Sequence, residues 1–125
     1  MLLNLLPQRL AVIHFEPDAK IPDWSMKAEF FSITRTPDEV SIFCDSAVMP
    51  DHPDKIDGWR AFRVAGQLEL SLTGVISTLA VPLAAKQIPV FSISTHDTDY
   101  MLVREDQLED AIDVLRRAGH SFNMA

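Results

Sequence analysis

The sequence predicts an α+β fold, in which residues 59–124 form one complete unit with the order strand-helix-strand-strand-helix-strand. Apolar residues recur every three or four positions from Leu72 to Leu83, which is the period of an amphipathic helix. A second helix has start and stop signals between Asp106 and Gly119. Short segments rich in β-forming residues lie around these helices, and the resulting order is that of a ferredoxin-like split βαβ unit.

Composition limits the possible functions. The chain has 125 residues, of which 47% are hydrophobic, so we expect one compact domain or two small units and not a disordered chain. A net charge of -7 argues against binding to nucleic acid or to an anionic membrane surface. Cys44 is the single cysteine, and no apolar stretch approaches the roughly 20 residues of a membrane span. The apolar start, residues 1–7, lacks the features of a signal peptide, so we expect a cytoplasmic protein.

The N-terminal half predicts an incomplete unit. Residues 9–16 are expected to form a strand, and residues 18–29 have room for a turn or one or two helical turns. Residues 30–44 show period-two apolar positions on both sides of a turn at 36–39, which predicts a hairpin. The proline- and aspartate-rich residues 45–58 are expected to form a linker.

The C-terminal half is more regular, and we place the division so that residues 1–58 and 59–125 are separate units. Pro82 is expected to bend the first helix. The second helix is expected to begin with Asp106 as N-cap and Glu109 reaching back, and to end with Arg116 and Arg117 before Gly119. The expected strands of this half are residues 59–65, 88–95, 100–103 and 121–124.

Five segments carry a resemblance to a known family: Phe31–Ile42, Gly58–Arg60, Leu72–Val75, Pro82–Ala84 and Ile88–Tyr100. In this order they resemble the small tandem ACT-domain proteins, which are related to the CASTOR-type amino-acid sensors and to the regulatory ACT pair of aspartate kinases. The resemblance covers roughly residues 10–120. It implies tandem ferredoxin-like (βαββαβ) ACT units, the first incomplete, with a free amino acid or similar small metabolite bound where the units meet. It also implies a homodimer and a protein partner that the sequence does not identify.

The first candidate ligand-binding segment is Leu72-Thr73-Gly74, at the expected start of the first helix. Backbone N–H groups at a helix N-terminus lack intrahelical partners and favour an anion, so they would take a ligand carboxylate. Gly74 would let the ligand approach the backbone closely. The alternative is that Ser71 or Thr73 caps the helix and Gly74 only permits close packing.

The second candidate segment is the polar turn that contains Thr95, His96, Asp97 and Asp99. A carboxylate here would accept charge-assisted hydrogen bonds from an ammonium or guanidinium group. The family resemblance implies that Thr95 and Asp99 face the ligand. The alternative is an ordinary hairpin tip whose side chains satisfy their own backbone.

Other chemistries find little support in the sequence. His96 with Asp97 and Asp99 is a weak metal set, because no matching cluster occurs elsewhere. The sequence has no Gly-x-Ser-x-Gly turn and no phosphate-binding loop. We therefore expect a non-enzymatic sensor module without a cofactor. A structural or protein-interaction module of the same fold without a ligand, and a small enzyme on this scaffold, are the alternatives.

Overall fold

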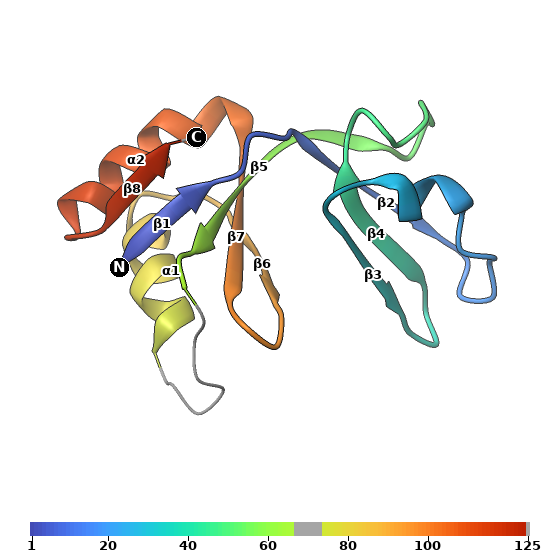
Figure 1. Ribbon diagram of the computed structural model, residues 1–125, viewed down its shortest axis with the longest axis horizontal. Helices are drawn as coiled ribbons and strands as arrows, with labels where there is room; N and C mark the ends of the chain where they lie inside the picture. The colour runs from blue at the N-terminus through green and yellow to red at the C-terminus, as the bar shows by residue number, and fades with distance from the viewer. Residues whose placement is uncertain (67–73, 125) are drawn as a thin grey trace. The chain divides into compact units, whose positions relative to one another are not determined.

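The chain divides into two compact units. The computed structural model describes residues 1–66 and 74–124 (Figure 1). The C-terminal unit consists of Met1–Pro7 and Arg60–Ala125, and the N-terminal unit is Gln8–Trp59. The two stretches of the C-terminal unit are far apart in the sequence, and residues 1–7, which were expected to belong with residues 8–58, are part of the C-terminal unit.

The C-terminal unit has the predicted order of strands and helices, and the α+β fold class is confirmed. In chain order the elements are β5 (Ile56–Val64), α1 (Val75–Ala85), β6 (Phe91–Ser94), β7 (Asp99–Arg104), α2 (Leu108–Arg117) and β8 (Ser121–Met124), with β5 beginning in the N-terminal unit. Within this unit β7 pairs with β6 and with β5. The helices begin and end within a few residues of their expected positions.

One strand of this unit was not predicted. β1 (Leu2–Leu5) pairs antiparallel with β5, with Leu3 opposite Val64, and parallel with β8, with Leu3 opposite Phe122. β1 therefore lies between the first and last strands of the split βαβ unit (Figure 1). Only four residues long, it shows too little periodicity to be recognised as a strand.

Both helices bury one face in a common core with the sheet. α1 contributes Val75, Leu79 and Leu83, which are spaced four residues apart and so share one face. Ile76, an apolar residue in the predicted helix, is 38% exposed. The core comprises Leu3, Phe62, Val64, Val75, Leu79, Leu83, Ile88, Met101, Val103, Ala111, Ile112 and Leu115.

The start of α2 differs from the predicted capping box, and its end agrees with the prediction. A short 3₁₀ helix, Glu105–Gln107, precedes α2, so Gln107 and not Asp106 is the N-cap, and it makes no side-chain cap hydrogen bond. The tighter turn occupies the position that the Asp106 cap required. Arg116 and Arg117 lie in the last turn, and Gly119 has a φ of +96°.

The N-terminal unit is a sheet built mostly from a hairpin. β2 (Leu10–Phe15) and β3 (Phe31–Arg35) each pair antiparallel with β4 (Val40–Asp45), and β2 also pairs with β5. These strands confirm the predicted strand and hairpin. Within residues 8–59, all of which are described, the 3₁₀ helix Asp23–Lys27 is the one helical segment.

The core of the N-terminal unit contains the single cysteine. Cys44 is fully buried in β4, with Ile42 and Ile13 in the same cluster. Burial, assisted by the neighbouring Asp45 carboxylate, raises the pKa of the Cys44 thiol to about 11. The thiol is therefore protonated at neutral pH and acts as a small core side chain.

Candidate functional site

Gly74, one of the predicted ligand-binding residues, occupies the N-cap position of α1. Its φ of +78° lies in the left-handed region that favours glycine. The N–H and hydroxyl of Thr78 both donate to the Gly74 carbonyl, at 2.9 and 2.6 Å. Leu72 and Thr73, the other two predicted residues of this segment, lie outside the described residues, as does Ser71.

The first turn of α1 has the electrostatics of an anion-binding helix end. It contains no acidic residue, and glycine at the N-cap offers no side-chain acceptor. The N–H groups of residues 75–77 have no intrahelical acceptor, because the first turn of a helix has no preceding carbonyls. These donors and the positive end of the helix dipole favour a carboxylate at this end of α1.

The turn between β6 and β7 is closed by two threonines. The Thr95 N–H donates to the Thr98 carbonyl at 2.9 Å, and the Thr98 N–H donates to the Thr95 hydroxyl oxygen at 3.3 Å. The Thr95 hydroxyl also donates to the Thr98 carbonyl at 3.1 Å. Much of the Thr95 hydrogen-bonding capacity is therefore used within the turn, as in the hairpin-tip alternative.

Thr98 joins this turn to the end of β5, a role that the sequence did not predict. Its hydroxyl donates to the Val64 carbonyl at 2.8 Å, and the residue is 4% exposed. A threonine in a polar turn gives no sequence signal of burial, because its contact with Val64 spans 34 residues. The hydrogen bond holds the turn beside the point where the chain leaves β5 for α1.

The acidic residues of the turn occupy different environments. Asp97 accepts a hydrogen bond from His96 at a distance of 2.8 Å, and both side chains are exposed. Asp99 is half-buried at the start of β7. Because side chains alternate along a strand, Asp99 shares the helix-covered face of the sheet with Met101, which lies in the core. Asp99 is thus the carboxylate placed on the side of the sheet where α1 lies.

Gly74, at the start of α1, and the β6–β7 turn lie at the same end of the C-terminal unit. Figure 1 shows the β6–β7 turn and the first turn of α1 at that end, and Thr98 ties the turn to Val64 at the end of β5. A helix end that favours a carboxylate and a half-buried acid that favours a positive group therefore occur on one face of one unit. That combination suits a small zwitterionic ligand.

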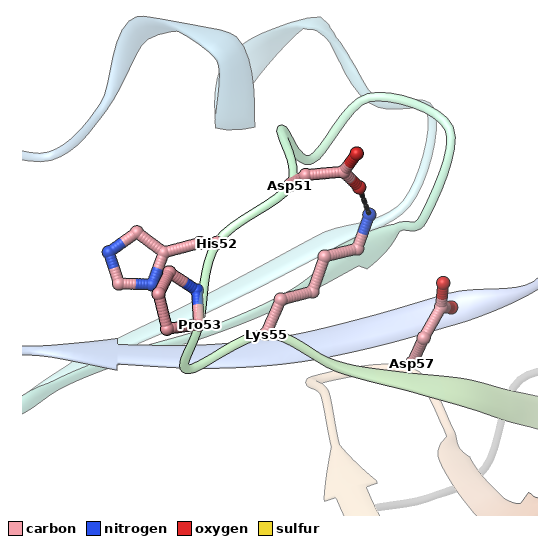
Figure 2. Close-up of a pocket in the computed structure, with 5 residues that line it drawn as sticks. All are labelled: Asp51, His52, Pro53, Lys55 and Asp57. Atoms are coloured by element: carbon pink, nitrogen blue, oxygen red, sulfur yellow. Dashed lines mark ion pairs between the residues drawn. The ribbon is translucent and has the colours of Figure 1, made fainter.

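A separate hollow lies in the N-terminal unit, in the stretch that was expected to be a linker. It has a volume of about 530 Å³ and is lined by Asp51, His52, Pro53, Lys55 and Asp57 (Figure 2). The Lys55 ammonium donates to the carbonyls of Met49 at 2.8 Å and Ser46 at 3.2 Å, and lies 3.9 Å from Asp51.

These contacts give Lys55 a structural role. Its side chain is only 10% exposed, and its donors are directed at the loop that contains Ser46 and Met49. Burial opposes ionisation of Asp57, but hydrogen bonds from Ser46 and the Gly58 N–H outweigh it and lower the Asp57 pKa. We interpret the contacts of these charged groups as interactions that hold the loop containing Ser46 and Met49 in one conformation.

A second hollow, of about 600 Å³, lies between α1 and α2. Its walls are mixed: Pro82 and Val114 are apolar, whereas Lys86 and Asp110 are charged. Arg117 pairs with Asp113 at 3.3 Å along the same wall. This set of groups does not converge on one point in the way that a specific small-molecule site requires.

Residues 1–66 and 74–124, the described part of the chain, contain no group of three or more His, Cys, Asp or Glu side chains that could hold a metal ion. In the same ranges, neither helix has the length and apolar character needed to span a membrane.

Comparison with known proteins identifies the family. The ACT-domain family model matches residues 55–117, half of the chain, and a model described as an N-terminal domain matches residues 8–52. The cytosolic arginine sensor for mTORC1 subunit 1 of Mus musculus is 31% identical over 105 residues, which are 78% of this chain and 32% of that protein. The chain thus spans about a third of the length of this relative.

Solved structures agree with this assignment. An Agrobacterium tumefaciens protein is 34% identical with a TM-score of 0.92, and the match covers 99% of this chain and 92% of that protein. Aspartate kinase of Clostridium acetobutylicum, 12% identical with a TM-score of 0.63 over 89% of this chain and 33% of that enzyme, shares the fold. The chain belongs to the ACT-domain family.

Proposed function

We propose that this chain is a non-enzymatic regulatory module that senses a free amino acid with a positively charged side chain, arginine first among them. The observation that carries the proposal is that the first turn of α1 and the half-buried Asp99 lie at the same end of one ACT unit. The relationship to a protein named as a cytosolic arginine sensor supports the choice of ligand.

The ligand's carboxylate is assigned to the first turn of α1. The backbone N–H groups that follow Gly74 are directed out of the helix end, and no acidic side chain in that turn competes for them. Among the described residues, a Cβ added at Gly74 would meet the Ser77 hydroxyl at 3.8 Å, an ordinary van der Waals distance. The described side chains therefore leave room for a carboxylate beside these donors.

The ligand's positive group is assigned to Asp99. A half-buried carboxylate is screened less than an exposed one, so its hydrogen bond to a guanidinium or ammonium group is correspondingly stronger. Asp97 and the chain's net charge of -7 add to a potential that attracts cations. The same potential disfavours aspartate or glutamate, which would bring a second carboxylate to the turn.

A thermal-shift screen against the twenty amino acids tests the proposal. A ligand at about 100-fold over Kd adds roughly 2.7 kcal/mol to the free energy of unfolding, which gives a clear rise in Tm. We expect L-arginine to raise Tm and L-glutamate to leave it unchanged. If no amino acid at millimolar concentration raises Tm, the proposed function is wrong.

One observation favours a second candidate, a protein-interaction module without a ligand. The mutual hydrogen bonds of Thr95 and Thr98 satisfy the turn internally, so it needs no ligand to be ordered. Under this alternative the screen gives no shift while the protein is folded and binds its protein partner.

Assembly and location are part of the proposal. Among the described strands, β6 pairs with β7 alone, and the edge of a sheet can pair with a strand of a second copy. We therefore propose a homodimer that acts in the cytoplasm on a protein partner still to be found. Light scattering that returns a mass near 14.0 kDa at micromolar concentration, with and without L-arginine, would contradict the dimer.

A further inference from the structure

Pro82 leaves one carbonyl of α1 without its helical donor. Proline has no N–H, so the oxygen four residues earlier, that of Thr78, loses the hydrogen bond that an unbroken helix would supply. His120 Nε2 lies 3.3 Å from this oxygen. The imidazole therefore replaces the missing backbone donor, with its proton on Nε2.

The end of α2 holds the imidazole in place. The Gly119 N–H donates to the Arg116 carbonyl at 3.0 Å, and the His120 N–H donates to the Leu115 carbonyl, also at 3.0 Å. With Gly119 at positive φ, these two bonds form a Schellman motif. His120 is 6% exposed, so its ring is fixed by the helix end and by packing.

Thr78 connects His120 to the proposed ligand site. The Thr78 carbonyl accepts from the imidazole, while the Thr78 N–H and hydroxyl donate to the Gly74 carbonyl at 2.9 and 2.6 Å. Gly74 is the N-cap whose following N–H groups are assigned to the ligand carboxylate. One residue thus connects the imidazole with the first turn of α1.

We propose that His120, in its neutral form, is a positioning residue for the ligand site: through Thr78 it fixes Gly74 and the first turn of α1, and protonation of its ring releases them. This inference rests on the proposed function, because it assigns a regulation to that same site. Amino-acid affinity would then fall when the pH drops below the range in which His120 is neutral.

The surroundings of the ring explain why protonation would release it. His120 Nδ1 lies 3.0 Å from the Met1 amino group and, with the proton on Nε2, accepts a hydrogen bond from it. A second proton on Nδ1 would turn this nitrogen into a donor that faces the Met1 amino group, which is also a donor. Both groups would then be positively charged and would repel each other. Burial, then the Met1 ammonium, lower the pKa of His120, and the hydrogen bond to Thr78 only partly opposes them.

The other elements around the ring carry no compensating charge. Residues 75–85 of α1 and 121–124 of β8 include no charged side chain. α2 ends in Arg116 and Arg117, and Arg117 pairs with the exposed Asp113 at 3.3 Å. Protonation of His120 therefore gains no carboxylate partner among these elements.

Calorimetric titration with L-arginine at pH 8 and pH 5.5 tests the inference on three variants. His120→Gln keeps a side-chain N–H donor for Thr78 but does not titrate, His120→Ala removes the donor, and His14→Gln is the control, since it removes an exposed histidine of the N-terminal unit. We expect wild type and His14→Gln to bind about two- to tenfold more weakly at pH 5.5, the range of one hydrogen bond.

The expected results for the two His120 variants differ. His120→Gln should bind close to wild type at pH 8 and lose most of the pH dependence, whereas His120→Ala should bind more weakly at both pH values. In the ligand-free protein, the amide NMR signals of Gly74 and Thr78 should titrate with the His120 ring in wild type and stay constant in His120→Gln. These signals report on the connection itself and not on ligand binding.

Failure of the positioning role of His120 and failure of the proposed function give different results. If wild type binds L-arginine but His120→Gln keeps the wild-type pH profile, the positioning role is wrong and the proposed function stands. If wild type binds no amino acid, the proposed function fails, and with it the ligand half of this inference. The NMR titration then tests the structural part of the inference. If the amide signals of Gly74 and Thr78 do not change as the His120 ring titrates, the connection through Thr78 is refuted as well.

Discussion

Asp99→Asn is the substitution that examines the ligand site most directly. It keeps the shape of the side chain and removes its negative charge, so a ligand guanidinium loses a charge-assisted hydrogen bond. Such bonds contribute roughly 1.5–3 kcal/mol, against about 0–1 kcal/mol for an exposed ion pair. Asp99 is half-buried on the helix-covered face, which places it in the stronger class. We therefore expect L-arginine to bind about ten- to a hundredfold more weakly.

Calorimetric titration measures this loss, and a matched variant controls for charge. Asp38→Asn removes the same charge from the exposed turn of the other hairpin, between β3 and β4. It should leave the affinity for L-arginine within about twofold of wild type, because an exposed charge is screened by salt. Equal affinities for wild type and Asp99→Asn, in protein with an unchanged Tm, would place the site elsewhere and refute the assignment of Asp99.

Three further predictions concern stability. Gly74→Ala should lower the free energy of unfolding by about 1–2 kcal/mol in urea titration, because alanine is strained at a φ of +78° although space is available; an unchanged midpoint would mean that the helix start has another conformation. Thr98→Val removes the donor to the Val64 carbonyl and should cost roughly 1–3 kcal/mol in the same assay, with a loss below 0.5 kcal/mol counting against that bond. The pKa of His120 is lowered on folding, so at acidic pH the unfolded chain binds more protons than the folded protein. The free energy of unfolding should therefore be fully retained above the ordinary histidine pKa of 6.5 and should fall as the pH drops below it. The fall should be smaller in His120→Gln.

Local patterns predicted most of the fold. α1 is recognisable from the spacing of Leu79 and Leu83, and the end of α2 from Gly119 directly after it. Both signals depend on neighbouring residues only, so the sequence was sufficient to place the two helices. β1 was missed because four residues carry almost no periodicity, and its pairing with β5 and β8 depends on segments that follow far along the chain. The Asp106 cap failed for a related reason, since a 3₁₀ turn there satisfies the backbone instead.

The candidate site was predictable in its chemistry and not in its connections. Asp99, at the start of a strand, and Gly74, at the start of a helix, are recognisable from residue type and position. Nothing in the sequence indicates that Thr98 is buried, because its partner is a backbone carbonyl of β5. Sequence patterns show which groups a segment offers, whereas the contacts that orient those groups come from other segments.

Pro82 shows how far this limit extends. A proline inside a predicted helix removes the N–H that would donate to the carbonyl four residues earlier. That the Thr78 carbonyl needs another donor therefore follows from the sequence alone. This carbonyl meets the buried imidazole of His120, which the Schellman motif at the end of α2 holds in place. A substitution that removes the donor should therefore be felt at the start of α1, whereas replacing Pro82 by alanine would return a backbone N–H to Thr78 and make His120 dispensable there. The double variant Pro82→Ala with His120→Ala should accordingly recover stability that His120→Ala alone loses.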